Sequence, residues 1–151
     1  MIKIITVGTL KEKYLKEAIE EYKKRISKYT KIEIIELKDE GINDINKVLK
    51  LEEERIIKQI NDKDYVITLE IEGNQYSSED FASIFEKKLS ENSNISFVIG
   101  GSYGLSEEIK KKANLHLSFS KMTFPHQLFR VLLLEQIYRA YKINNNESYH
   151  K

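Results

Sequence analysis

The chain has 151 residues, of which 40% are hydrophobic and 32% are charged, and its formal net charge is only +1. This length and balance predict a single domain over residues 1–151 with a core of its own. The near-neutral charge excludes any simple argument from bulk charge for nucleic-acid binding. The absence of cysteine excludes disulfides, thiolate metal sites and a cysteine nucleophile. Because no signal-peptide pattern and no apolar run of ~20 residues is present, we expect a cytoplasmic protein that does not cross a membrane.

The predicted elements alternate between strand and helix five times. Short apolar runs bounded by turn residues indicate strands, and apolar residues at three- and four-residue steps indicate helices. Strands are expected at residues 2–7, 32–37, 65–71, 95–99 and 114–119, with a turn at 72–74. Helices are expected at residues 10–28, 44–60, from an N-cap at Ser78 to about Leu89, from Ser106 to 112, and along 128–141. This order predicts an α/β fold with a mainly parallel sheet and helices on both faces.

The last predicted helix, residues 128–141, is apolar on nearly all sides. A terminal helix of this kind usually packs one face on its own sheet and the other on a partner subunit. We therefore expect a homodimer in which at least one of Leu133 and Leu134 lies in the interface.

The stretch Phe119–His126 joins the fifth strand to this helix. Pro125 suits the first turn of a helix, and it pushes Phe124 toward an extended backbone. The residues between must cross as a loop at the carboxyl end of a strand, where open α/β sheets bind their ligands. A plain connection between strand and helix explains the spacing equally well.

A glycine-rich loop follows the fourth strand at Gly100, Gly101 and Gly104. It lacks the Lys-Ser/Thr pair of a P-loop, and it is not the G-x-G-x-x-G pattern of dinucleotide-binding proteins. Glu107 and Glu108 begin the next helix, where their charges oppose a bound phosphate. A neutral or cationic ligand held by backbone groups fits this loop better, although a tight turn alone would also need these glycines.

The three histidines are too dispersed to predict a metal site, and none has a carboxylate at ligand spacing. His116 lies in a predicted strand and is expected to be structural, whereas His126 can face the loop before the last helix. Tyr149 and His150 lie in a tail beyond that helix. Little apolar surface remains for this tail to bury, so we expect it to serve a substrate more than stability.

Four segments in this order and spacing resemble one family: Ile99–Leu105, Leu117–Gln127, Glu135–Ala140 and Tyr149-His150. The chain resembles, over its whole length, the bacterial 23S rRNA pseudouridine methyltransferases. These are small enzymes of the SPOUT class with a C-terminal trefoil knot, and they methylate N3 of a pseudouridine in helix 69 of 23S rRNA. Tyr103 is a departure, because relatives tend to have a smaller or more polar residue in that loop.

The resemblance implies S-adenosyl-L-methionine as cofactor and a single SPOUT methyltransferase domain. It places the cofactor against eight residues of this chain: Leu69, Gly100, Phe119, Ser120, Lys121, Met122, Thr123 and Phe124. These lie at or near the carboxyl ends of predicted parallel strands, where their loops converge. The knot enters by resemblance only, because chain connections do not normally thread through loops.

The resemblance also implies an rRNA substrate within the ribosome and no metal. We name His150, Tyr149 and Arg139 as candidates for removing the N3 proton or stabilising the charge that results, although water could accept the proton. The tail could serve its own chain or the partner of a dimer. Residues 121–151 carry five basic and two acidic side chains, and this segment is expected to contact RNA phosphates. Two alternatives are a non-catalytic RNA-binding module with the same fold and a nucleotide-phosphate binder that uses the glycine loop.

Overall fold

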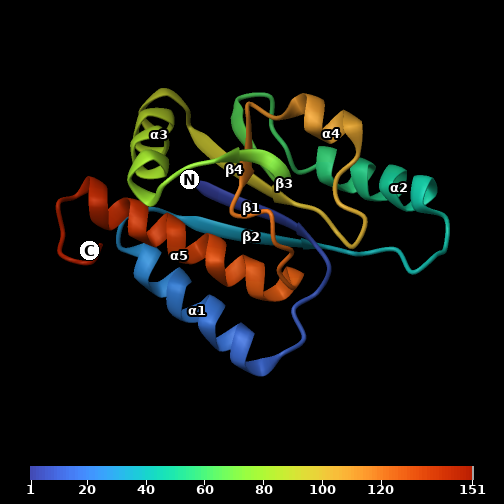
Figure 1. Cartoon of the computed structure of the whole chain (residues 1–151), viewed down its shortest axis with the longest axis horizontal. Coiled ribbons are helices and arrows are strands. Elements are labelled where there is room, and N and C mark those ends of the chain that lie inside the picture. The colour runs from blue at the N-terminus through green and yellow to red at the C-terminus, as the bar shows by residue number, and fades with distance from the viewer. Residues whose placement is uncertain (151) are drawn as a thin grey trace.

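The computed structural model describes residues 1–150 and contains one sheet of five parallel strands in the order β2-β1-β4-β3-β5 (Figure 1). The strands are β1 (Ile2–Val7), β2 (Ile32–Leu37), β3 (Asp64–Gln75), β4 (Asn94–Ile99) and β5 (Leu115–Ser118). The helices are α1 (Lys13–Ser27), α2 (Ile45–Ile57), α3 (Ser78–Glu91), α4 (Glu107–Lys112) and α5 (His126–Asn144). The predicted α/β class, the parallel sheet and the five alternations are confirmed. Lys151, the end of the predicted domain, lies outside the described residues.

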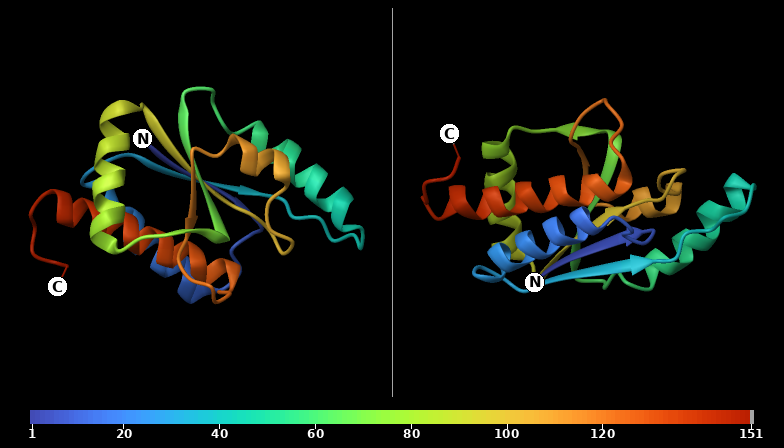
Figure 2. Two further views of the ribbon diagram at one scale, coloured as in Figure 1. Left: turned by 45° about the horizontal axis from the view of Figure 1, so that its top comes forward. Right: turned by 90° about the horizontal axis from the view of Figure 1, so that it is seen from below.

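Helices cover both faces of the sheet, as expected (Figures 1 and 2). Side chains alternate between the faces of a strand, so Ile4 and Phe97 join a core under α1, α3 and α5, whereas Ile5 and Val98 join a smaller core under α2 and α4. Within residues 1–150, no helix is long and apolar enough to cross a membrane. The threading of the C-terminal part into a knot stays a prediction.

Strand β3 differs from its prediction. The predicted strand ended at residue 71 before a turn, but β3 continues to Gln75. Leu117 of β5 lies opposite both Leu69 and Asn74 of β3, because the pairing register shifts between these two residues. The expected turn at 72–74 is therefore part of a bulge that interrupts one long strand, and its residues project from the carboxyl end of the sheet.

Three helix boundaries also differ. α1 begins at Lys13, three residues after the predicted start. Ser77, and not Ser78, caps α3, because its Oγ accepts a hydrogen bond from the amide of Asp80 at 3.0 Å. Pro125 has an extended ψ of 134° and therefore precedes the first turn of α5, where it was expected to lie within that turn.

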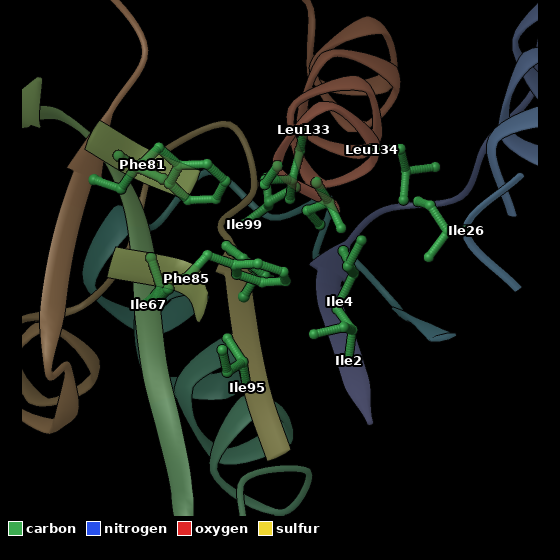
Figure 3. Close-up of a cluster of buried hydrophobic side chains, with 14 of the residues drawn as sticks. Ile2, Ile4, Ile26, Ile67, Phe81, Phe85, Ile95, Ile99, Leu133 and Leu134 are labelled. Atoms are coloured by element: carbon green, nitrogen blue, oxygen red, sulfur yellow. The ribbon is translucent and has the colours of Figure 1, made fainter. Parts of the chain in front are cut away.

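Helix α5 packs between α1 and α3. Leu133 and Leu134 are both fully buried in the core of this one chain (Figure 3). The prediction that one of them lies in a subunit interface is therefore wrong. The helix looks apolar all round in sequence because it is covered by the sheet below and by a neighbouring helix on each side.

A buried arginine ties α5 to the sheet. Arg130 is 2% exposed and donates to Glu36 Oε2 of β2 at 2.5 Å and to the carbonyl oxygen of Gly8 at 2.8 Å. Glu36 also accepts from the amide of Leu10 at 2.7 Å. Burial by itself raises the pKa of Glu36, but the bonds from Arg130 and Leu10 outweigh it and lower that pKa below its ordinary value. The first turns of α5 are thus held over the carboxyl ends of β1 and β2.

The amino end of the sheet contains a buried ion pair. Lys3 Nζ lies 2.6 Å from Asp64 Oδ2 and donates to the carbonyl of Gln59 at 2.8 Å. Ser96 Oγ donates to the same carboxylate at 2.9 Å. Burial tends to raise the pKa of Asp64, but these donors together with the amide of Asn61 lower it. The network lies at the start of β1, β3 and β4, which is the end of the sheet opposite the predicted site.

We predict that Arg130→Lys lowers the free energy of unfolding by about 1.5–3 kcal/mol, the usual contribution of hydrogen bonds to a charged group. A lysine keeps the charge but has no planar fork that reaches Glu36 and Gly8 together. Urea denaturation measures the change. Arg25→Lys, at an exposed pair with Glu21 on α1, is the matched control and should leave stability nearly unchanged. Equal small losses in both variants would contradict the anchoring role of Arg130.

Candidate active site

A cavity of about 470 Å³ opens at the carboxyl end of the sheet. Its walls come from the ends of β3, β4 and β5, the glycine loop after β4, and the loop that leads into α5. The apolar side chains that line it are Leu69, Ile71, Ile99, Leu105, Leu117, Phe119, Met122, Phe124 and Phe129. This volume lies within the range of small-molecule sites in proteins, which are mostly apolar and contain few polar groups.

The structure brings together seven of the eight residues predicted to bind a cofactor. Those that line the cavity are Leu69, Gly100, Phe119, Ser120, Met122, Thr123 and Phe124. Lys121 does not line it. The β3 bulge supplies Ile71 and Glu72, which sequence reasoning missed because it treated these residues as part of a strand end and a turn.

Close backbone contacts determine the shape of the glycine loop. A Cβ at Gly100 would lie 2.5 Å from the carbonyl oxygen of Gly104, so no side chain fits there without moving the backbone. Gly104 has a φ of +78°, which L-residues rarely adopt, and its amide donates to the carbonyl of Gly101 at 3.0 Å. The tight turn and the ligand-binding loop were alternatives in sequence, and here one loop does both: it turns tightly and it lines the cavity.

Two carboxylates of α2 lie beneath this loop. Glu53 accepts from the hydroxyl of Ser106, the N-cap of α4, at 2.7 Å. Glu52 is buried, and its carboxylate oxygens would lie 3.1 and 3.3 Å from a Cβ at Gly101. Burial raises the pKa of Glu52, and the amide of Glu40 only partly offsets this effect. The loop is thus supported from below by side chains of a helix about 50 residues earlier in the chain.

His116 lies in β5, where it was expected to be structural. Its Nδ1 contacts the carboxylate of Glu70, which also accepts from Thr68 Oγ1 at 2.6 Å. Glu70 begins the β3 bulge and lines the cavity. The cluster therefore connects β3 with the edge strand β5 at the point where the bulge leaves the sheet. No sequence motif indicated Glu70, because the pairing of β3 with β5 creates this contact.

The polar groups of the cavity suit a flat, neutral or cationic ligand. Its acidic lining residues are Glu70 and Glu72, whereas Lys110 and His126 are the basic or titratable ones. These lining residues do not form a cluster of cations that could bind a phosphate group. Within residues 1–150, no group of three or more His, Cys, Asp or Glu side chains is arranged to bind a metal.

The three predicted catalytic residues form a separate cluster, in which Tyr149 and His150 of the tail lie against the second half of α5. Arg139 Nη1 lies 3.0 Å from His150 Nδ1, and Arg139 Nε donates to Glu135 at 2.9 Å. Tyr149 donates its hydroxyl hydrogen to the same glutamate. His150 Nε2 contacts the carboxylate of Glu79 on α3. Since a guanidinium can only donate, His150 Nδ1 accepts and Nε2 carries the hydrogen.

The tail is anchored to its own chain (Figure 2). Glu147 accepts from Lys142 at 2.9 Å and from the hydroxyl of Tyr29 at 2.7 Å, and these bonds lower its pKa to about 2. The Tyr149 ring packs on Tyr138 with centroids 5.0 Å apart, and its bond to Glu135 raises its pKa to about 12. The expectation that the tail has little surface to bury is therefore wrong, because Tyr138 of α5 packs on the Tyr149 ring and Tyr29, just after α1, bonds to Glu147.

The tail cluster and the cavity lie at different places along α5. None of the three predicted catalytic residues lines the cavity. Phe129, which does, precedes Arg139 by ten residues, or about 15 Å along a helix. The two predicted parts of the site are therefore not in contact within this chain.

The basic residues of the C-terminal segment are mostly paired within the chain, and one of them cannot take its predicted role. Arg130 is buried and cannot contact RNA phosphates. Arg139 pairs with Glu135, and Lys142 pairs with Glu147. Lys121, exposed in the loop before α5, is the basic residue of residues 121–150 that makes no ion pair within the described chain.

Relatives of known description match the whole chain. A protein described as ribosomal RNA large subunit methyltransferase H from Caldicellulosiruptor saccharolyticus is 55% identical over 154 residues, covering 100% of both chains. The protein of the same description from Caldicellulosiruptor bescii is 51% identical with the same coverage. One from Clostridium perfringens is 54% identical over 157 residues and covers 99% of each chain.

A solved structure has the same fold. A probable methylase family protein from Haemophilus influenzae superposes with a TM-score of 0.59 over 99% of this chain and 70% of its own, at 18% identity. The family model described as "Predicted SPOUT methyltransferase" matches residues 1–150. The cavity at the carboxyl end of a parallel sheet, the full-length relatives and this match lead to one conclusion: the chain belongs to the SPOUT methyltransferase family.

Proposed function

We propose that the protein is a cytoplasmic 23S rRNA (pseudouridine-N3)-methyltransferase that acts on helix 69 of assembled ribosomes and uses S-adenosyl-L-methionine. The observation that carries the proposal is the cavity, which gathers seven of the eight residues predicted to bind this cofactor. Support also comes from relatives more than half identical over the full chain that are described as ribosomal RNA large subunit methyltransferase H.

The lining of the cavity fits this cofactor. The adenine ring is flat and can stack its faces on apolar side chains, and Leu117, Phe119 and Phe129 provide a matching slot. The sulfonium group is cationic, so it needs no phosphate cradle, and the carboxylates of Glu70 and Glu72 offer it a favourable charge. Backbone groups of the glycine loop would supply the remaining hydrogen bonds, because Gly100 and Gly101 leave them uncovered.

The bound cofactor supplies a methyl group: the C–S bond breaks with its electron pair remaining on sulfur, N3 of the base forms the new bond, and the N3 proton leaves. The residues of this chain position the two reactants and exclude water. In the docked tail, both nitrogens of His150 are engaged, with Arg139 and with Glu79. For His150 to accept the N3 proton, one of these contacts must open when RNA binds.

Substrate recognition would depend on shape more than on charge. The formal net charge of +1 and the internal pairing of Arg130, Arg139 and Lys142 leave few free cations on this part of the surface. A preassembled ribosomal surface can be recognised through its geometry, with a contact from Lys121 to a phosphate near the cavity. Transfer of a labelled methyl group to assembled ribosomes, with naked 23S rRNA alongside, tests the proposal; equal methylation of both would contradict the requirement for assembly.

The homodimer remains part of the proposal, with a revised interface. Leu128 is 38% exposed and Leu132 is half-buried, and residues four apart lie on the same face of a helix. We predict that Leu128→Asp combined with Leu132→Asp dissociates the dimer without unfolding the chain, as measured by light scattering and circular dichroism. Ile42→Asp, equally exposed before α2, is the control and should remain dimeric. A wild-type protein that is monomeric at micromolar concentration would contradict the dimer.

We predict that the proposed cofactor raises the melting temperature of the protein. Ligand at about a hundred times its Kd stabilises the folded state by roughly 2.7 kcal/mol, which raises Tm by roughly 5–10 °C for a domain of this size. We expect this shift with S-adenosylmethionine or S-adenosylhomocysteine and little with ATP. Gly100→Ala should abolish it because its Cβ would meet backbone, whereas Gly101→Ala should only weaken it because the flexible Glu52 side chain can move. An equal shift with ATP would favour a nucleotide-phosphate binder.

The tail prediction separates catalysis from cofactor binding. Truncation after Asn146 removes the contacts of Glu147, Tyr149 and His150, so Tm should fall modestly. The shift with S-adenosylhomocysteine should persist, because none of these residues lines the cavity, while methyl transfer to ribosomes should be lost. His150→Ala should lower the rate about 10²–10⁴-fold if the histidine is a general base; a loss near tenfold would indicate positioning only. Full activity of the truncated enzyme would exclude the tail from the mechanism.

A complementation experiment determines which chain the tail serves. Heterodimers combine a chain truncated after Asn146 with a full-length chain carrying Gly100→Ala. If tails cross between subunits, one site has an intact cavity and an intact tail, and activity returns. If each tail serves its own chain, heterodimers form but stay inactive.

A further inference from the structure

Exposed apolar side chains lie at the opening of the cavity. Ile71 of the β3 bulge is 51% exposed and Met122 of the loop before α5 is 75% exposed, and both line the cavity. Tyr103 is 45% exposed, and its neighbours Ser102 and Gly104 line the cavity as well. Each of the three loops around the cavity therefore carries one large apolar side chain that is exposed to solvent. Exposed apolar surface gathered at one place commonly marks an interaction site.

Tyr103 lies at the tip of a tight turn and has no partner of its own. The turn runs from Gly101 to Gly104 and is closed by the hydrogen bond between these two residues. Within residues 1–150, the Tyr103 ring pairs with no aromatic side chain and its hydroxyl makes no hydrogen bond. The tyrosines of α1 and α5 do pair with one another, as Tyr22 does with Tyr138. The ring of Tyr103 is therefore available to a molecule outside the chain.

The turn that carries Tyr103 is fixed from below. Glu53 of α2 accepts from the hydroxyl of Ser106, just after the turn, at 2.7 Å. The buried side chain of Glu52 lies against Gly101. Because the backbone is already held in place, a ligand that stacks on the ring has little chain entropy to remove, and more of the contact energy contributes to binding.

The charges near the opening provide few contacts for RNA phosphates. Lys110 lines the cavity, but its Nζ lies 3.6 Å from the carboxylate of Glu107, and Glu70 and Glu72 line the same cavity. Lys121 is exposed in the loop before α5. Uncharged contacts must therefore contribute to holding RNA at this place. Stacking of unpaired bases on aromatic side chains is such a contact, and it tolerates any base because every base has a flat face.

We propose that Tyr103 stacks on an unpaired nucleobase that flanks the target nucleotide of the RNA substrate. The inference rests on the proposed methyltransferase function and adds a positioning residue for its substrate. Tyr103 does not itself line the cavity, so a base stacked on its ring stays outside the space assigned to the cofactor. The target base approaches the methyl group through the opening, and the stacked neighbour fixes the position of the RNA strand there.

Three substitutions at Tyr103 separate stacking from other roles. Tyr103→Ala should lower kcat/KM for ribosome methylation about 5- to 150-fold, the usual effect of losing one stacked base. The loss should appear in KM with kcat nearly unchanged, because stacking holds the bound substrate and the transition state equally. Tyr103→Phe and Tyr103→Trp keep an aromatic ring and should retain the wild-type kcat/KM. Calorimetric titration of S-adenosylhomocysteine should give the wild-type Kd for all three variants.

A fluorescent label detects the stacked base directly. The chain contains no tryptophan, so Tyr103→Trp produced with 5-hydroxytryptophan carries a single indole label at the proposed contact. This label can be excited at wavelengths where the tryptophans of ribosomal proteins absorb little. Ribosomes should quench its emission, because a nucleobase stacked on an indole ring quenches fluorescence. Ser93→Trp with the same label, at an exposed position before β4 at the opposite end of the sheet, is the matched control and should keep its emission.

The outcomes separate this inference from the function on which it rests. A wild-type enzyme that binds S-adenosylhomocysteine but methylates no ribosome contradicts the proposed function. An active wild type together with fully active Tyr103→Ala, or a label at position 103 that ribosomes do not quench, contradicts the stacking. A loss of S-adenosylhomocysteine affinity in Tyr103→Ala would assign the ring to the cofactor, and dissociation of a dimer would assign it to a second copy of the chain. Either result overturns the inference.

Discussion

The position of α5 depends on the hydrogen bonds of Arg130. This helix has no side-chain cap at its start, since Pro125 precedes it. Its first turns are held instead by the guanidinium, which joins Glu36 of β2 to the carbonyl of Gly8 after β1. The same helix lines the cavity and carries the tail. One buried, charged contact therefore places the residues of the whole candidate site relative to the sheet.

The two ends of the sheet differ in how their polar groups are satisfied. At the amino end, Lys3 and Asp64 pair inside a closed network, which removes these two charges from solvent. At the carboxyl end, the bulge of β3 and the turn at Gly100 leave backbone groups beside an open cavity. Rigid support comes from beneath, where Glu53 bonds to the cap of α4. A ligand at the open end can thus lie close to the backbone of the glycine loop and of the β3 bulge.

In the docked tail, the residues proposed to act in catalysis bond to one another and to neighbouring carboxylates. Tyr149 donates to Glu135, and both ring nitrogens of His150 are engaged. The bond to Glu135 raises the pKa of Tyr149 to about 12, so its hydroxyl gives up its proton less readily than that of an ordinary tyrosine. Substrate binding would have to exchange some of these internal bonds for bonds to RNA, which couples tail rearrangement to recognition of the correct substrate.

The sequence by itself determined the alternation of strands and helices, the parallel sheet and the loops at its carboxyl end. Hydrophobic periodicity and glycine positions are local signals, so these features could be predicted from neighbouring residues. The resemblance then indicated eight residues for a cofactor site, and seven of them line the cavity at the carboxyl end of the sheet. Only the tertiary structure decided the bulge in β3, because that depends on β5 pairing with two separated parts of one strand. It also decided that Leu133 and Leu134 are core residues and that Arg130 is buried. Each of these depends on contacts between residues far apart in the chain. The periodicity of apolar residues indicates which face of a helix is buried, but it does not indicate which distant element covers that face.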